Sequence, residues 1–208
     1  MVKYKEIEIH LNNNYVETKG LNLYLDKEIR LSIGVNQIDD YLNVLKYIVD
    51  YVTTSNISIS DNQNIGYYSW LLQFRLDDQD YYDLYEISSD GSNFIKGCDT
   101  AISIVRNQSE TCSYYGLVPQ FPNFNQMVVI SQGVYEGKDI EGIRYESPDH
   151  MSGWWLITDD YNDDIKSLMT VHYSHVAFAR PDILKYLALP FGYRFLMENG
   201  NFGIAKDE

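Results

Sequence analysis

The chain has 208 residues, of which 45% are hydrophobic and 14% aromatic, and its formal net charge is −14 at pH 7. This composition predicts a folded protein of one large or two small domains and excludes a disordered chain. Both halves are acidic, since residues 1–125 contain 9 basic and 17 acidic side chains and residues 126–208 contain 7 and 13. Such acidity disfavours nucleic acids and anionic membranes and favours a basic protein partner. The alternative is that it only keeps the protein soluble.

Cysteine content and the lack of targeting segments predict a cytoplasmic protein without cofactors. Cys98 and Cys112 are too few for a disulfide framework or a zinc site, so we expect both to be small buried side chains on or beside a helix. Residues 1–10 carry charges throughout and lack the apolar core of a signal peptide. No run of 18 apolar residues is present, so we expect no membrane span.

The first half of the chain is expected to form antiparallel strands and two helices. Alternating apolar and polar residues predict strands, at residues 7–11, 21–25, 29–33, 57–59, 70–76 and 81–87. Asn36 is predicted to cap an amphipathic helix over residues 36–52. Asp99 is predicted to cap a second helix over residues 99–112.

The second half is predicted to begin after a boundary rich in glycine and proline, residues 116–125. We therefore expect an N-terminal α+β region of unknown type over residues 1–120 and a second α+β domain over residues 126–208. In the second domain, the sequence predicts strands at 127–130 and 153–158, a helix at 181–188 and an Asn-Gly hairpin at 198–200. The fold class is α+β, mainly antiparallel, with about three helices.

Several short motifs follow one another in a fixed order between residues 126 and 206. They are Val128-Val129-Ile130-Ser131, Gly142-Ile143-Arg144-Tyr145-Glu146, Met151-Ser152-Gly153-Trp154-Trp155, Asp159-Asp160, Arg180-Pro181-Asp182-Ile183 and Leu187-Ala188-Leu189-Pro190-Phe191-Gly192-Tyr193-Arg194-Phe195. In this order the segment resembles the C-terminal domain of immunity-protein family thirty-three, which accompanies bacterial polymorphic toxins. It departs from the family at Trp155 and at His150-Met151, where charged residues are more common.

The resemblance implies an immunity protein that binds and neutralises a cognate bacterial toxin by stoichiometric protein–protein inhibition. Such a protein would cover the active site of the toxin or block an essential movement, and it would not be an enzyme. Two alternatives remain open. One is a regulatory module that binds a small molecule or a peptide in a closed apolar pocket. The other is a hydrolase or transferase with converging carboxylates in a cleft.

Aromatic and acidic side chains are the candidate partner contacts, because tyrosine and tryptophan dominate interface hot spots and carboxylates would steer a basic partner. They are Tyr81, Tyr82, Asp83, Tyr85, Trp154, Trp155, Asp159, Asp160, Asp163 and Asp164. The alternatives are a strand that buries alternate tyrosines and a solvated acidic turn.

The sequence predicts neither a catalytic nor a metal site. His172 and His175 are three residues apart, but the residues around them favour a strand or a loop, which does not place both on one face. Asp160, Asn162 and Asp164 begin like a calcium loop that lacks its glycine and its final glutamate. Pairs of carboxylates are expected by chance in so acidic a chain and do not indicate a hydrolase.

Overall fold

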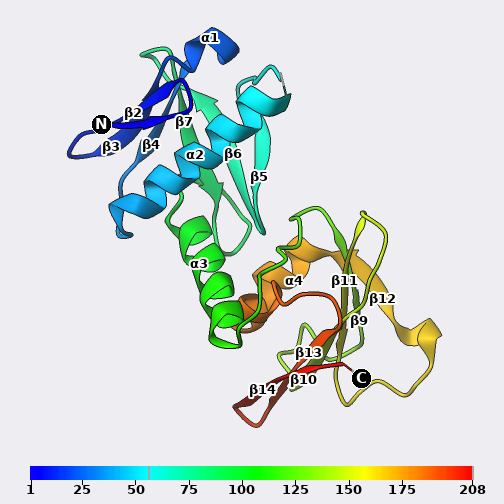
Figure 1. The fold of residues 1–208 in the computed structure, drawn as a ribbon. Helices are drawn as coiled ribbons and strands as arrows, with labels where there is room; N and C mark the ends of the chain where they lie inside the picture. The colour runs from blue at the N-terminus through cyan, green and yellow to red at the C-terminus, as the bar shows by residue number, and fades with distance from the viewer. Residues whose placement is uncertain (56, 208) are drawn as a thin grey trace. The chain divides into compact units, whose positions relative to one another are not determined.

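The protein is described from a computed structural model, which covers residues 1–55 and 57–207. The chain divides into two compact units, Met1–Ser103 and Ile104–Glu208, and helix α3 (Asp99–Tyr114) contains the boundary between them. Both units combine helices with mainly antiparallel sheet, so the predicted α+β class is confirmed (Figure 1). Within the described ranges, no helix has the length and apolar sequence that a membrane span requires.

The first unit is built on an eight-stranded sheet in the order β1-β2-β3-β4-β7-β6-β5, with β8 also paired to β7. Its strands are β1 (Val2–Tyr4), β2 (Ile7–Leu11), β3 (Tyr15–Lys19), β4 (Glu28–Ser32), β5 (Asn64–Tyr67), β6 (Trp70–Leu76), β7 (Tyr81–Ile87) and β8 (Phe94–Lys96). Only the β4–β7 pair among these is parallel. Helix α2 (Ile38–Ser55) packs on β2, β3 and β4, because its apolar stripe meets the apolar side of the alternating strands (Figure 1).

The second unit is built on a six-stranded sheet in the order β12-β9-β11-β10-β13-β14. Its strands are β9 (Met127–Ile130), β10 (Ile140–Arg144), β11 (Met151–Ile157), β12 (Met169–His172), β13 (Tyr193–Glu198) and β14 (Asn201–Lys206). Helix α4 (Tyr173–Ala179) and the 3₁₀ turns η1 (Ile165–Ser167) and η2 (Pro181–Tyr186) complete it. The predicted Asn-Gly hairpin joins β13 to β14, and both turn residues have positive φ, as a type I′ turn requires.

Three predicted elements are wrong. Residues 21–25 form not a strand but the single-turn helix α1 (Asn22–Leu25), in which Leu21 and Leu25 are buried while Leu23 is 84% exposed. Burial at a spacing of four residues fits a helical turn, whereas a strand would have placed all three leucines on one face. Residues 57–59 carry no strand, and the segment after His172 is helix α4 instead of a strand or loop.

Other local predictions are confirmed or refined. Cys98 and Cys112 are both free and fully buried, in or beside α3. The long helix begins at Ile38, two residues after Asn36, and the Asn36 side chain donates to Asp99 in α3. The predicted helix at 181–188 is the 3₁₀ turn η2, which ends at Tyr186.

A candidate partner-binding face on the C-terminal sheet

The Arg144 side chain ties together three segments of the second unit. Its side chain is only 3% exposed, and it donates hydrogen bonds to the backbone oxygens of Ser152 at 2.9 Å, Gln120 at 2.5 Å and Leu189 at 2.6 Å. The guanidinium also lies 4.7 Å from the ring centre of Phe191. Burial lowers the pKa of Arg144 to about 10. The Gly-x-Arg-Tyr motif is therefore a structural anchor.

Gly153 forms an irregularity in β11 that only glycine accommodates. Its φ is +83°, and a Cβ at this position would lie 2.2 Å from the backbone oxygen of Tyr145. The pairing register of β11 with β9 shifts between Met151 and Trp155, which marks a bulge at this point. The Ser-Gly-Trp motif thus sets which tryptophan faces the core.

The two tryptophans of β11 lie on opposite faces of the sheet. Trp154 is fully buried, and its indole N–H donates to the backbone oxygen of Leu187 at 2.9 Å. It therefore offers no surface to a partner in this structure, although it is one of the predicted contacts. Trp155 points to the other face and is partly exposed, with its ring edge-on to Tyr145 at 6.2 Å.

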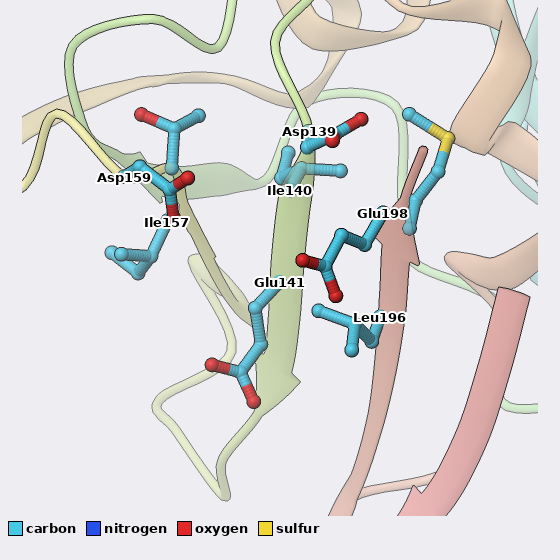
Figure 2. A pocket seen from close by; sticks show the side chains of 9 residues that line it. Asp139, Ile140, Glu141, Ile157, Asp159, Leu196 and Glu198 are labelled. Carbon is cyan, nitrogen blue, oxygen red and sulfur yellow. The ribbon is translucent and has the colours of Figure 1, made fainter. Parts of the chain in front are cut away.

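The strand register places apolar and acidic side chains in rows on the face that carries Trp155. Glu141 in β10 pairs with Ile157 in β11 and with Leu196 in β13, so these three side chains form one row. Asp139 just before β10, Asp159 just after β11 and Glu198 at the end of β13 lie beside this row and line one hollow with it. Figure 2 shows the carboxylates of Asp139, Glu141, Asp159 and Glu198 around this hollow.

This hollow, called the acidic pocket below, has a volume of about 200 Å³. It is lined by Asp139, Ile140, Glu141, Ile157, Thr158, Asp159, Leu196, Met197 and Glu198. Four of the nine lining residues are acidic and none is basic, while the aliphatic ones supply an apolar wall (Figure 2). The pocket is thus suited to a cationic side chain with an apolar stem.

Two of these carboxylates are engaged by the protein itself. Glu141 forms an ion pair with Arg194 at 3.0 Å, and Asp139 accepts the backbone N–H of Asn199 at 2.9 Å. Asp159 is exposed, and so is Glu198. Within residues 1–55 and 57–207, the described ion pairs include neither Asp159 nor Glu198, nor Asp139, whose partner is an uncharged N–H, so these three carry the uncompensated charge of the pocket.

The remaining acids predicted as contacts lie in the loop after β11. Asp160, Asp163 and Asp164 are exposed, but Asp160 pairs with Lys138 at 2.6 Å and Asp164 accepts the backbone N–H of Lys166 at the start of η1. The carboxylates of Asp160 and Asp164 are therefore already engaged by neighbouring residues of the protein.

Strand alternation divides the predicted contacts of the first unit between two faces. Tyr81, Asp83 and Tyr85 project to the face opposite α2, whereas Tyr82 points to the core and donates to the backbone oxygen of Ile59. Tyr81 and Tyr85 are partly exposed, whereas the Asp83 side chain is buried.

The acidic stretch of residues 77–86 is largely neutralised by partners that are distant in the sequence. Asp77 and Asp83 pair with Arg30, and Asp80 pairs with Lys27. Glu86 is buried and accepts the backbone N–H groups of Thr100 and Ala101 at the start of α3, and burial raises its pKa. Its role is that of a helix cap.

No metal site is found among residues 1–55 and 57–207, where no group of three or more His, Cys, Asp or Glu side chains could hold an ion. The His172 and His175 rings lie edge-on at 5.8 Å, one ending β12 and the other in α4.

Comparison with known proteins bears on the unit that carries the acidic pocket. Residues 107–207 match the family model of the Imm33-like domain. The resemblance to immunity-protein family thirty-three is therefore confirmed for the C-terminal part of the chain, and the match contains every residue that lines the acidic pocket. No curated protein and no solved structure matches the chain.

Three of the four acidic pocket residues were missed from the sequence: Asp139, Glu141 and Glu198. Glu198 is distant from the other two in the sequence, and only the pairing of β10 with β13 reveals that it lies beside them. The recognisable β13–β14 hairpin and the acidic turn after β11 were the sequence features that could have pointed to this pocket.

Proposed function

We propose that the protein is an immunity protein that binds a cognate bacterial toxin and neutralises it stoichiometrically. The match of residues 107–207 to the Imm33-like domain carries this proposal. In this proposal the protein acts in the cytoplasm by occlusion and without catalysis. The partner is a basic protein, consistent with the net charge of −14.

The docking surface proposed for the toxin is the face of the C-terminal sheet that carries Trp155 and the acidic pocket. A lysine or arginine of the toxin would place its stem against Ile157 and Leu196 and its charged group near Asp159 and Glu198. Trp155 would supply an aromatic anchor beside the pocket. The charge would speed the encounter, and the apolar contacts would slow dissociation.

A co-expression assay tests the function. The adjacent open reading frame is expressed inducibly in a heterologous host with and without this protein, and survivors are counted. Rescue only by the intact protein is the expected result. If the neighbouring gene product is toxic and this protein fails to neutralise it, the two are not a toxin and its immunity protein. If the neighbouring gene product is harmless, the assay gives no support to toxin neutralisation.

Charge reversal tests the docking face once the toxin is in hand. We expect Asp159→Lys with Glu198→Lys to lower the association rate by about tenfold at low salt and to weaken its salt dependence. The matched control is Glu136→Lys with Asp149→Lys, which makes the same charge change at exposed positions outside the pocket. Equal effects of the two pairs would show that only net charge matters and would reject the pocket as the docking point.

A further inference from the structure

Charged side chains form a row across the face of the N-terminal sheet that lies opposite α2. The strand register aligns His10, Glu17, Arg30, Asp83 and Arg75, from β2 to β6. Opposite charges alternate from Glu17 to Arg75, and directly opposed pairs of this kind stabilise a sheet. The row ends on a cation, and the partners of that cation decide what the surface can bind.

The interior cations of this face are already neutralised. Arg30 bonds to Asp83 at 2.9 Å and to Gln79 at 3.0 Å, and it also contacts Asp77. Lys96 contacts the second carboxylate oxygen of Asp83. Two carboxylates thus serve two cations, and neither Arg30 nor Lys96 needs a further anion.

Arg75 differs from both of them. Its Nε donates to Gln73 at 2.7 Å, and its guanidinium lies 4.4 Å from the ring centre of Tyr85 and 5.6 Å from that of Phe94. None of the ion pairs among residues 1–55 and 57–207 includes Arg75. The two rings and the Gln73 amide orient the guanidinium without neutralising it.

This guanidinium lines an open groove of about 640 Å³. The groove is formed by Tyr15, Arg30, Arg75, Leu76, Asp77, Asp78, Gln79, Asp83, Tyr85 and Lys96. We propose that the groove is a binding site for a carboxylate of a peptide segment, held by the guanidinium of Arg75.

The chemistry of the groove selects the ligand class. A guanidinium held in a plane matches a carboxylate through paired N–H donors. Tyr15 and Tyr85 offer rings to the neighbouring backbone or side chains of the peptide. Among the described residues that line the groove, Arg75 is the cation outside the ion pairs, which suits one carboxylate, while Asp77 and Asp78 at the edge of the groove repel a doubly charged phosphate more strongly than a singly charged carboxylate.

This site lies in the first unit and is independent of the proposed toxin neutralisation. Failure of one proposal therefore leaves the other intact, because the acidic pocket contains none of the groove residues.

Nuclear magnetic resonance on the full chain tests the proposal. The probes are acetyl-Gly-Glu-Gly-amide, acetyl-Gly-Gly-Gly with a free terminal carboxylate, the uncharged acetyl-Gly-Gln-Gly-amide and inorganic phosphate. We expect one or both carboxylate peptides to shift the Arg75 Nε–H resonance saturably, with a dissociation constant on the order of 1 mM. Which of the two binds more tightly distinguishes a side-chain carboxylate from a terminal one.

Variants localise the binding. Arg75→Gln should weaken it by about tenfold or more, and Arg75→Lys, which keeps the charge but not the paired donors, should also weaken it. Because the Arg75 resonance is lost in both variants, binding is followed by the amides of Tyr85 and Lys96. Lys19→Gln is the matched control, since it removes one positive charge from an exposed position outside the groove.

Three results would overturn the assignment: no saturable shift with either carboxylate peptide, unchanged affinity in both Arg75 variants, or binding of phosphate or the uncharged peptide as tight as that of the carboxylate peptides.

Discussion

Replacing Gly153 by alanine tests whether the bulge in β11 requires a residue without a side chain. A positive φ costs an alanine about 1 kcal/mol. At position 153 the alanine Cβ would also overlap the backbone oxygen of Tyr145, which would lie only 2.2 Å away. Relieving such overpacking costs about 2 to 3 kcal/mol more. We therefore expect the free energy of unfolding of the C-terminal unit to fall by about 3 to 4 kcal/mol.

Gly200→Ala is the matched control, because Gly200 has a φ of +76° but no neighbouring atom within 4 Å of its Cβ. Urea unfolding is followed by the Trp154 indole N–H resonance, which reports on this unit alone. With a slope of about 2 kcal/mol per molar urea, the midpoint should fall by about 0.5 M for Gly200→Ala and by about 1.5 to 2 M for Gly153→Ala. Equal shifts would refute the steric argument.

Three further predictions concern buried and capped polar groups. Arg144→Met leaves three backbone oxygens without their donor, so the free energy of unfolding should fall by about 3 kcal/mol or more in urea, and an unchanged midpoint would contradict the anchor role. Trp154→Phe removes the donor to Leu187 and should cost about 2 kcal/mol in the same assay. Hydrogen bonds from Ser88 and then Ser92 lower the pKa of Asp90 to about 2. The ionised Asp90 carboxylate therefore stabilises the folded state above pH 4, and this contribution is lost as the pH falls through 2. A carboxyl NMR titration should show a higher pKa of Asp90 in the Ser88→Ala variant.

The sequence predicted helices and strands well where the hydrophobic periodicity extended over many residues and fitted only one kind of element. The helix around residues 38–55 and the strands at 70–76 and 81–87 lie close to their predicted bounds. The run at 21–25 was ambiguous, because three alternating leucines fit a strand while a helical turn needs only Leu21 and Leu25 on one side. The exposure of Leu23 depends on the surrounding fold, which local pattern does not reveal.

The candidate site was harder to predict than the fold. Asp77, Asp83 and Glu86 lie within ten residues of one another in the sequence, but Arg30 neutralises the first two and Glu86 caps helix α3. Conversely, Asp139 and Glu198 share a pocket although the sequence separates them widely. Charge patterns in the sequence therefore indicate the class of partner better than they indicate where on the protein that partner binds.

The acidic pocket is also assembled late during synthesis. Asp139 and the hairpin residue Asn199, which it holds, are 60 positions apart in the chain. A ribosome that adds about 5 to 20 residues per second needs about 3 to 12 s to cover that interval. Until β13 has been made, a nascent chain presents only part of the pocket, and any partner that depends on Glu198 has no complete surface to bind.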